Sequence, residues 1–318
     1  MKALVTGGNG FLGRHIVAAL RSVGAAVRVF DRHPRQDHSD IEQVTGDLLT
    51  SRSLESAFEG VDVLVHLAAS LHGKSDEMIH NMVEGSRQLL RSMARTTTRR
   101  IVLASSFSVY NWSNVGRSLS EEDETLSETT MSGYDRYARA KVLQEKLTRD
   151  FAREHGFTLT VLRPAVIWGQ SVWGEFLLGK RAGPIQTVVA PSAQIRLVYV
   201  ENAADAFVLA AQRTTGGELV LNVIDDPQLT TWQYAKVVQR HLGGLRLPLP
   251  YRLGWNGAKV ASLLLGRSPR LPYFLQPQLV EALHKPVTWS NRRLREYLGW
   301  SPRFTFGQAL ARTELRYG

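Results

Sequence analysis

The sequence predicts an α/β fold in which a doubly wound parallel sheet carries a smaller C-terminal cap. Short, almost wholly apolar runs alternate with helical stretches through the first half of the chain. Strands that are apolar along their whole length are usually buried on both faces by covering helices. A glycine-rich turn also joins the first apolar run to the first helix, as in open α/β sheets that bind phosphate groups.

The first βα unit carries the most specific signal. Residues 2–6 form an apolar run that predicts a buried strand, and residues 11–23 show helical periodicity. Three glycines in a G-x-x-G-x-x-G spacing run from the turn between these elements into the start of the helix. Glycines let the backbone approach a pyrophosphate, and a helix N-terminus offers free N–H groups and positive dipole. We therefore expect a dinucleotide to be held by the residues of this turn, which are Gly7, Gly10, Phe11, Leu12 and Gly13.

The remaining elements follow from the same patterns. Further strands are predicted at residues 27–30, 61–67, 100–104, 158–162, 197–200 and 219–223. Helices are predicted at residues 53–58, 78–93, 137–155 and 203–212. We expect a Rossmann-type dinucleotide-binding domain over 1–169, its sheet completed by 196–224. The segments 170–195 and 225–318, richer in Pro, Gly, Trp and Tyr, are expected to form a substrate-binding cap.

Composition excludes several classes of function. The 318 residues hold no cysteine, so disulfides, thiol nucleophiles and cysteine-ligated metals are ruled out. No His/Asp/Glu cluster has metal-ligand spacing, so no metal is expected. The net charge of +10 comes from scattered Lys and Arg without a nucleic-acid-binding motif. With no signal peptide and no integral membrane segment in the sequence, we expect a cytoplasmic protein that acts on a small molecule, with no nucleic-acid partner.

The cofactor preference depends on the end of the second strand. Asp31 lies 18 residues beyond Gly13. An acidic residue there hydrogen-bonds the ribose hydroxyls and repels a 2′-phosphate, which favours NAD. The neighbouring Arg32 leaves NADP possible, because arginine can pair with that phosphate. Asp47 and Leu48 come directly after Gly46, in a third loop that is expected to hold the adenine. Considered by itself, an aspartate at position 47 is more typical of a turn or helix cap.

A tyrosine–lysine pair is the predicted catalytic centre. Tyr137 and Lys141 are four residues apart, so a helix places them on one face. A nearby ammonium is expected to lower the tyrosine pKa toward the range useful for acid–base catalysis. Ser106, after the strand at 100–104, is predicted to hydrogen-bond the substrate oxygen. Tyr134 is the weaker candidate, because Ala138 and not a lysine lies four residues after it.

These motifs make the chain resemble an extended short-chain dehydrogenase/reductase of the NAD-dependent epimerase/dehydratase type over nearly its whole length. The matching segments are TGGNGFLG at 6–13, GDL at 46–48, HLAA at 66–69, SSFSVY at 105–110, YARAK at 137–141, LRPAVIWG at 162–169, VYVENAADA at 198–206 and LGWSPR at 298–303.

The resemblance assigns roles by position. It implies catalysis by Ser106, Tyr137 and Lys141, with Lys141 also holding the nicotinamide ribose. It further implies that Leu67, Ala68 and Ala69 line the cofactor path, and that Pro164 borders the nicotinamide. The family usually has an asparagine where Met82 stands here, with Asn81 displaced by one residue, so Asn81 is given no role. A homodimer through the helices at 78–93 and 137–155 is expected from the resemblance.

Departures from the family pattern narrow the function. Phe107 and Ser108 replace the Asp-Glu pair that nucleotide-sugar 4,6-dehydratases use for water elimination, and Val166 replaces the asparagine of the epimerases' R-x-x-N pattern. The RP at 163–164, the YVEN at 199–202 and the C-terminal region are more similar to the 3β-hydroxysteroid dehydrogenase-like and dihydroflavonol-reductase-like branches. These act on hydrophobic hydroxy or keto substrates.

The cap residues agree with an apolar substrate. The segment 245–280 is rich in Leu, Tyr and Trp, although packing in the core is the more typical role for most of these side chains. Trp168 and Trp173 are expected to add aromatic surface near the site. Interleaved basic residues suggest contact with an acidic headgroup or a membrane surface, although a solvated face is more typical of such a pattern. They are Arg246, Arg252, Lys259, Arg267 and Arg270.

Three hypotheses for the function follow. The first is an NAD(P)-dependent oxidoreductase that interconverts a secondary alcohol and a ketone on a largely hydrophobic substrate. The second is a nucleotide-sugar epimerase that retains and recycles NAD. The third is an NAD(P)-binding sensor without catalysis.

Overall fold

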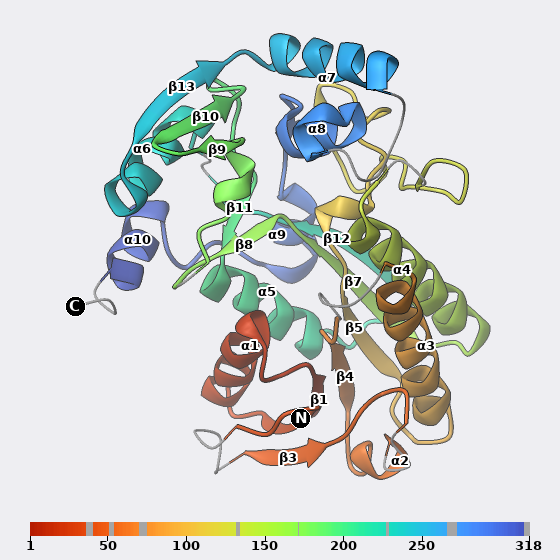
Figure 1. Cartoon of the computed structure of the whole chain (residues 1–318). Helices are drawn as coiled ribbons and strands as arrows, with labels where there is room; N and C mark the ends of the chain where they lie inside the picture. The colour runs from red at the N-terminus through yellow and green to blue at the C-terminus, as the bar shows by residue number, and fades with distance from the viewer. Residues whose placement is uncertain are drawn as a thin grey trace.

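Seven parallel strands form the central sheet, in the order β12-β7-β5-β4-β1-β2-β3 (Figure 1). The computed structural model describes residues 1–35, 41–50, 54–69, 75–131, 134–170, 172–226, 229–265 and 272–314. The strands of this sheet are β1 (Lys2–Thr6), β2 (Ala26–Asp31), β3 (Glu42–Thr45), β4 (Val63–His66), β5 (Arg100–Ala104), β7 (Thr158–Pro164) and β12 (Glu218–Val223). The predicted doubly wound α/β architecture is confirmed, although the edge strand β3 was not predicted.

Alternating side chains divide the sheet between two hydrophobic layers. In β1, Ala3 and Val5 enter one layer and Leu4 the other, because successive side chains of a strand point to opposite faces. Figure 1 shows the helices on both faces, α1 and α5 over one and α3 and α4 over the other. The helices around the sheet are α1 (Phe11–Ser22), α2 (Leu54–Ala57), α3 (Ser75–Ala94), α4 (Arg136–Glu154) and α5 (Val200–Gln212).

Smaller elements surround the carboxyl ends of the strands. The further strands are β6 (Ser118–Leu119), β8 (Val166–Trp168), β9 (Arg181–Ala182), β10 (Ile185–Val189), β11 (Leu197–Tyr199), β13 (Leu245–Leu249) and β14 (Thr288–Trp289). The further helices are α6 (Thr231–Leu242), α7 (Tyr251–Leu265), α8 (Pro277–His284), α9 (Arg292–Leu298) and α10 (Phe306–Glu314), with 3-10 turns η2 (Phe107–Val109), η4 (Glu175–Leu177) and η5 (Tyr273–Leu275). Strands β13, β10 and β9 form a sheet of their own.

Three sequence predictions about these elements need correction. The run at 197–200 does not rejoin the main sheet, because β11 pairs with β8 in a separate two-stranded sheet; only β12 completes the main sheet, beside β7. The helix expected to begin at 203 begins at Val200. The helix predicted over 53–58 is the short α2, and Ser53 lies outside the described residues.

The C-terminal region packs back onto α5. Asn202 links three segments, since its amide donates to Asp225 Oδ1 and to the Phe304 carbonyl, each at 2.8 Å. The indole of Trp300 donates to the Asn202 carbonyl at 3.0 Å. The YVEN and LGWSPR motifs therefore join the end of the chain to the sheet. No helix in the described ranges combines the length and apolar character that crossing a bilayer requires.

Candidate active site

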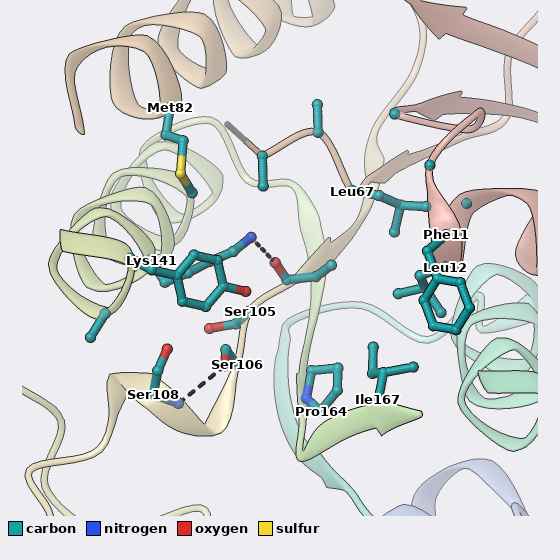
Figure 2. A pocket seen from close by; sticks show the side chains of 18 of the residues that line it. Phe11, Leu12, Leu67, Met82, Ser105, Ser106, Ser108, Lys141, Pro164 and Ile167 are labelled. Carbon is teal, nitrogen blue, oxygen red and sulfur yellow. Dashed lines mark hydrogen bonds between the residues drawn. The ribbon is translucent and has the colours of Figure 1, made fainter. Parts of the chain in front are cut away.

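One cavity of about 1110 Å³ opens at the carboxyl ends of the central strands and brings the predicted site together. Residues from the ends of β1, β2, β4, β5 and β7 line it, and Figure 2 shows several of them facing a common space. Its lining includes every residue predicted to bind cofactor or to act in catalysis, namely Gly7, Gly10, Phe11, Leu12, Gly13, Asp31, Arg32, Asp47, Leu48, Leu67, Ala68, Ala69, Ser106, Tyr137, Lys141 and Pro164.

The glycine turn has the shape that a pyrophosphate requires. Gly7 has a φ of +72°, and a Cβ on it would lie 3.0 Å from the backbone of Ala68. A Cβ on Gly13 would lie 2.7 Å from Gly8 Cα. Gly10 is the N-cap of α1 and provides no side-chain cap, so the helix N-terminus faces the cavity without a capping hydroxyl or carboxylate. The residues present therefore fit a bound dinucleotide phosphate.

Asp31 ends β2 beside this turn. One carboxylate oxygen accepts a hydrogen bond from the Asn9 backbone N–H at 3.1 Å, which ties the end of the strand to the glycine loop. The exposed Arg32 lines the same part of the cavity. Asp47 accepts from the Leu49 N–H at 2.9 Å, as in an Asx turn, so its carboxylate has the structural role that its sequence context suggested.

The two serines after β5 have different surroundings. Ser105 is buried, and its hydroxyl donates to Glu145. The Ser106 hydroxyl caps η2 by accepting from the Ser108 N–H at 3.1 Å, and it lies on the cavity wall beside Tyr137, with which it hydrogen-bonds. This difference favours Ser106 over Ser105 as the hydroxyl that meets a substrate. Figure 2 shows Ser105, Ser106 and Ser108 on one stretch of chain below Lys141.

Helix α4 presents Tyr137 and Lys141 to the cavity from its first two turns. The Asp135 carboxylate caps the helix by accepting from the Tyr137 and Ala138 N–H groups at 2.8 and 2.9 Å. The Lys141 ammonium donates to the Ala104 carbonyl at 2.7 Å and to Gln144 Oε1 at 2.9 Å. Its nitrogen lies 6.0 Å from the centre of the Tyr137 ring.

The expected lowering of the tyrosine pKa is wrong for this structure. Burial raises the pKa of Tyr137 to about 12, against a smaller opposing effect of hydrogen bonding to Ser106. Burial also lowers the pKa of Lys141 to about 8, although the Glu145 carboxylate favours its charged form. The ammonium is directed at Ala104 and Gln144 rather than at the phenol oxygen, so it does not offset the desolvation of Tyr137.

A buried polar chain extends behind Lys141, and sequence reasoning missed it. Gln144 Nε2 donates to Ser86 Oγ at 2.9 Å, Ser86 Oγ meets His66 Nε2 at 2.9 Å, and His66 Nδ1 meets Thr6 Oγ1 at 2.7 Å. Burial lowers the pKa of His66 to about 3, so the imidazole is neutral. The lysine is therefore held by a network that crosses from α4 through α3 to β1.

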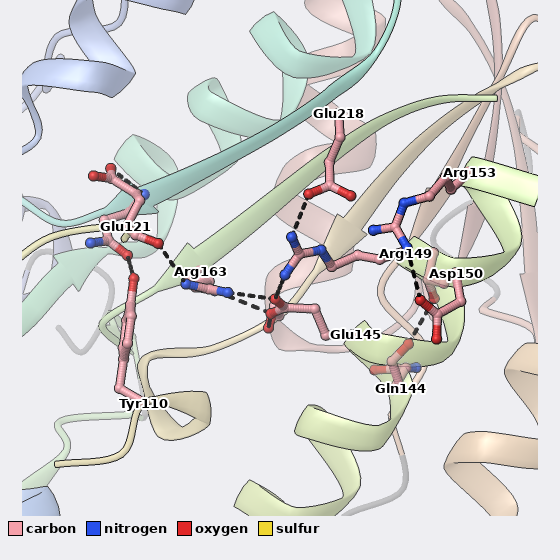
Figure 3. A network of polar contacts seen from close by, with 12 residues as sticks. Tyr110, Glu121, Gln144, Glu145, Arg149, Asp150, Arg153, Arg163 and Glu218 are labelled. Atoms are coloured by element: carbon pink, nitrogen blue, oxygen red, sulfur yellow. Dashed lines mark hydrogen bonds and ion pairs between the residues drawn. The ribbon is translucent and has the colours of Figure 1, made fainter. Parts of the chain in front are cut away.

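A buried ion pair joins α4 to β7 below the site (Figure 3). Arg163 Nη2 lies 2.6 Å from Glu145 Oε1, and both side chains are almost fully buried. Because Glu145 also accepts from Ser105, one carboxylate connects α4, the loop that carries Ser105, and β7. No local pattern in the sequence signals this contact, because Glu145 and Arg163 meet only through the packing of α4 on the sheet.

Asn81 and Met82 both line the cavity, but only Met82 is buried. Met82 packs with Met78 and Ala140, and Tyr137 lies against this group. The family's asparagine position is thus occupied by a methionine that makes an apolar contact with α4.

The other end of the cavity is largely apolar, and it is not formed by the residues expected. Trp168 and Trp173 are buried in a separate hydrophobic cluster and do not line the cavity. Of the described residues between 245 and 280, only Leu279 lines the cavity. The observed lining at this end is Trp112, Val166, Ile167, Val172, Phe176, Leu177, Arg196, Leu279, Ala282 and Leu283.

Two polar groups at this end were not predicted. Ser108 has a buried hydroxyl without a hydrogen-bond partner among the described residues. Arg196 stacks 3.9 Å from the Trp112 ring centre and donates to the carbonyls of Ala282 and Lys285, which ties α8 to the cavity wall. Ser108 lies within the SSFSVY motif and Arg196 precedes the VYVENAADA motif, but only the fold brings the two residues to the same end of the cavity.

Comparisons with known proteins identify the family of the chain. A family model described as the NAD dependent epimerase/dehydratase family matches residues 3–223. The chain is 28% identical to a 3-beta-hydroxysteroid dehydrogenase of Mycolicibacterium neoaurum, with 98% of this chain and 89% of that protein aligned. It is 25% identical to the decarboxylating sterol-4-alpha-carboxylate 3-dehydrogenase of Mus musculus, over 98% of this chain and 90% of that protein.

Solved structures share the fold. A short-chain dehydrogenase/reductase superfamily protein from Agrobacterium tumefaciens with bound NAD superposes with a TM-score of 0.74 at 21% identity, covering 100% of this chain and 97% of that one. The resemblance inferred from the motifs, including that to 3β-hydroxysteroid dehydrogenases, is confirmed by these matches.

Proposed function

The chain belongs to the NAD dependent epimerase/dehydratase family, and we propose that it catalyses net oxidoreduction between a secondary alcohol and a ketone on a largely hydrophobic substrate. It is an NAD-dependent enzyme of the extended short-chain dehydrogenase/reductase type. The observation that carries the proposal is the convergence of Ser106, Tyr137 and Lys141 with the glycine turn in one cavity.

The proposed chemistry assigns one task to each side chain. NAD, when bound along the glycine turn, accepts or supplies the hydride. The Ser106 hydroxyl donates to the substrate oxygen and orients it. In ketone reduction Tyr137 donates its proton to that oxygen, and a pKa of about 12 keeps the phenol protonated until then. In alcohol oxidation the same oxygen takes the proton back.

Lys141 is proposed to act in two ways. Its position beside the Ala104 carbonyl places it where a nicotinamide ribose would lie. Its ammonium, 6.0 Å from the centre of the Tyr137 ring and without a hydrogen bond to the phenol, adds a positive charge that favours the phenolate at a distance once the proton has left. The remaining predicted residues are proposed to hold the dinucleotide, with Asp31 on the adenosine ribose, Asp47 and Leu48 near the adenine, and Pro164 against the nicotinamide.

The substrate class follows from the apolar end of the cavity. Its walls of Trp112, Val166, Phe176 and Leu283 offer few hydrogen-bond donors or acceptors, which suits a ring system carrying a single hydroxyl or keto group. Two relatives are by name a hydroxysteroid and a sterol carboxylate dehydrogenase. We therefore propose a sterol-like or similarly apolar alcohol as substrate.

We further propose that residues 1–169 and 196–224 bind the cofactor, while 170–195 and 225–318 form the substrate side. The latter segments supply Phe176, Leu177, Leu279 and Leu283 to the cavity. Two further parts complete the proposal. A homodimer through α3 and α4 is proposed on the family resemblance, and a cytoplasmic location on the sequence features given above.

The test is cofactor-dependent turnover of the wild type and a tyrosine variant. With NAD and a panel of 3β-hydroxysteroids, the wild type should form NADH, and Tyr137→Phe should lower kcat/KM by about 10²–10⁴-fold while NADH still binds. Tyr134→Phe is the matched control, since Tyr134 lies near the same cavity and should cost less than about tenfold.

Equal losses in the two tyrosine variants, or unchanged turnover in Tyr137→Phe, would refute the assignment. Inversion of a nucleotide sugar without net NADH formation would instead favour the epimerase hypothesis. NAD binding without turnover of any alcohol or ketone would favour the sensor.

A further inference from the structure

Large apolar side chains gather on an outer surface of the molecule, away from the sheet. Twelve such side chains are exposed among the described residues, and seven of them lie between Leu245 and Leu265. Leu263 and Leu264 are 85% and 79% exposed. We call β13 and α7 together the outer cap surface; its exposed apolar members are Leu245, Leu247, Leu253, Val260, Leu263, Leu264 and Leu265. Ile185 on β10 pairs with Leu245 and extends it.

Helix α7 turns its apolar stripe away from the protein. Leu253, Val260 and Leu264 are spaced i, i+7 and i+11, so they lie along one side of the helix. Ala258, which the helical spacing places on the opposite side, is its buried residue. The helix packs on α8 and η5, and Figure 1 shows it at the periphery beyond α8. Nothing in the described chain covers the stripe.

Basic residues flank this stripe. Arg252, Asn256, Lys259 and Leu263 form the neighbouring row at i, i+4, i+7 and i+11. The sequence contains no acidic residue between Asp226 and Glu281, a stretch that holds Lys236, Arg240, Arg246, Arg252, Lys259, Arg267 and Arg270. The last two lie outside the described residues. The Lys259 ammonium lies 3.5 Å from the centre of the Trp255 ring.

We propose that the outer cap surface binds peripherally to a bilayer containing anionic phospholipid. An apolar stripe beside a row of cations is the arrangement of interfacial helices, whose leucines enter the acyl boundary while the cations meet the phosphates. A second copy of the chain is a poor occupant, because a two-fold contact through this surface would place Arg252 and Lys259 against their own counterparts.

The surface is also placed to serve the cavity. Helix α7 packs on α8, and α8 contributes Leu279, Ala282 and Leu283 to the apolar end of the cavity. This part of the inference rests on the proposed function. If the substrate is an apolar alcohol, it dissolves in the bilayer, and the contact through α7 places the apolar end of the cavity next to that bilayer. The membrane contact itself depends only on the exposed leucines and the charge.

The experiment is co-sedimentation of the full chain with vesicles, without cofactor or substrate. One set of vesicles contains phosphatidylcholine alone, and the other contains phosphatidylcholine with phosphatidylglycerol. The wild type should bind the anionic vesicles at least about tenfold more tightly than the neutral ones, less so at high salt. Leu264→Ser/Lys259→Gln should weaken anionic binding by at least about tenfold.

Val23→Ser/Arg292→Gln is the matched control, because it removes one exposed apolar side chain and one exposed cation elsewhere. It should bind like the wild type. Thermal melts of both variants verify that they fold. Equal binding by the two double variants, equal binding to both kinds of vesicle, or no binding at all would overturn the proposal, as would a wild-type dimer that Leu264→Ser/Lys259→Gln dissociates. Because the vesicle assay contains neither cofactor nor substrate, a failure of the turnover assay would not change the vesicle-binding results.

Discussion

The carboxyl edge of the sheet and the outer cap surface differ in the kind of side chain that each one buries or exposes. At the sheet edge, even charged side chains are buried, and Lys141, Glu145 and Arg163 are each less than 5% exposed. On the outer cap surface, leucines such as Leu263 are almost fully exposed. Polar groups lie inside where hydrogen bonds satisfy them, and apolar groups lie outside where no layer covers them.

The difference shows that an apolar pattern predicts burial only where the fold supplies a partner. Strands of the central sheet have helices on both sides, so nearly every apolar residue in them is enclosed. Helix α7 has α8 and η5 on one side and nothing in the described chain on the other. The expectation of core packing for most apolar residues of 245–280 was therefore wrong for seven of them.

The largest expected effect concerns the buried ion pair. Glu145→Gln should lower the free energy of unfolding by about 3–5 kcal/mol, because Arg163 keeps its charge without a buried carboxylate. Chemical denaturation measures the loss. On the same helix, the exposed Asp150 pairs with Lys146, and Asp150→Asn should leave the denaturation midpoint unchanged. Similar losses in both variants would contradict the contrast between buried and exposed charge.

Two leucine truncations compare the regions directly. Leu20→Ala in α1, where the side chain is fully buried, should cost about 2–5 kcal/mol. Leu264→Ala should change stability by less than about 0.5 kcal/mol, because its side chain is already in contact with solvent. Both are measured by denaturation without lipid. A large loss in Leu264→Ala would mean that α7 packs against protein in solution.

A smaller effect should appear in the pH profile of ketone reduction. Tyr137, with a pKa of about 12, stays protonated through the working range, so it does not limit the rate as an acid. Lys141 loses its charge as the pH rises through about 8. We therefore expect kcat/KM to fall above about pH 8, by up to about tenfold per pH unit. Lys141→Arg keeps the charge and should move this decline upward; an unmoved decline would assign it to another group.

Most of the nucleotide-binding half could be predicted from the sequence. The glycine spacing, Asp31 and the Tyr137–Lys141 spacing are local patterns, and the parallel sheet then brings their strand ends to one edge. The Glu145–Arg163 pair and the chain through Gln144, Ser86 and His66 join residues far apart in the sequence. They depend on the register of α4 against the sheet, which local patterns do not specify.

The cap could not be predicted in the same way. Its strands β9, β10 and β13 are short and mixed in composition, so they lack the apolar runs of the central sheet. Trp168 and Trp173 were expected to add aromatic surface near the site, yet they pack into the separate cluster around Tyr234. Which face of an apolar helix is buried depends on neighbours that periodicity alone does not identify.

The most direct test of net, NAD-dependent oxidoreduction is the nucleotide content and affinity of the purified protein. Nucleotide released on denaturation is quantified by mass spectrometry, and the nucleotide-free protein is titrated with NADH and NADPH. The account predicts little retained nucleotide and reversible binding, tighter for NADH because the Asp31 carboxylate repels a 2′-phosphate. Stoichiometric NAD that does not exchange would contradict net oxidoreduction, and failure to bind either nucleotide would contradict the site itself.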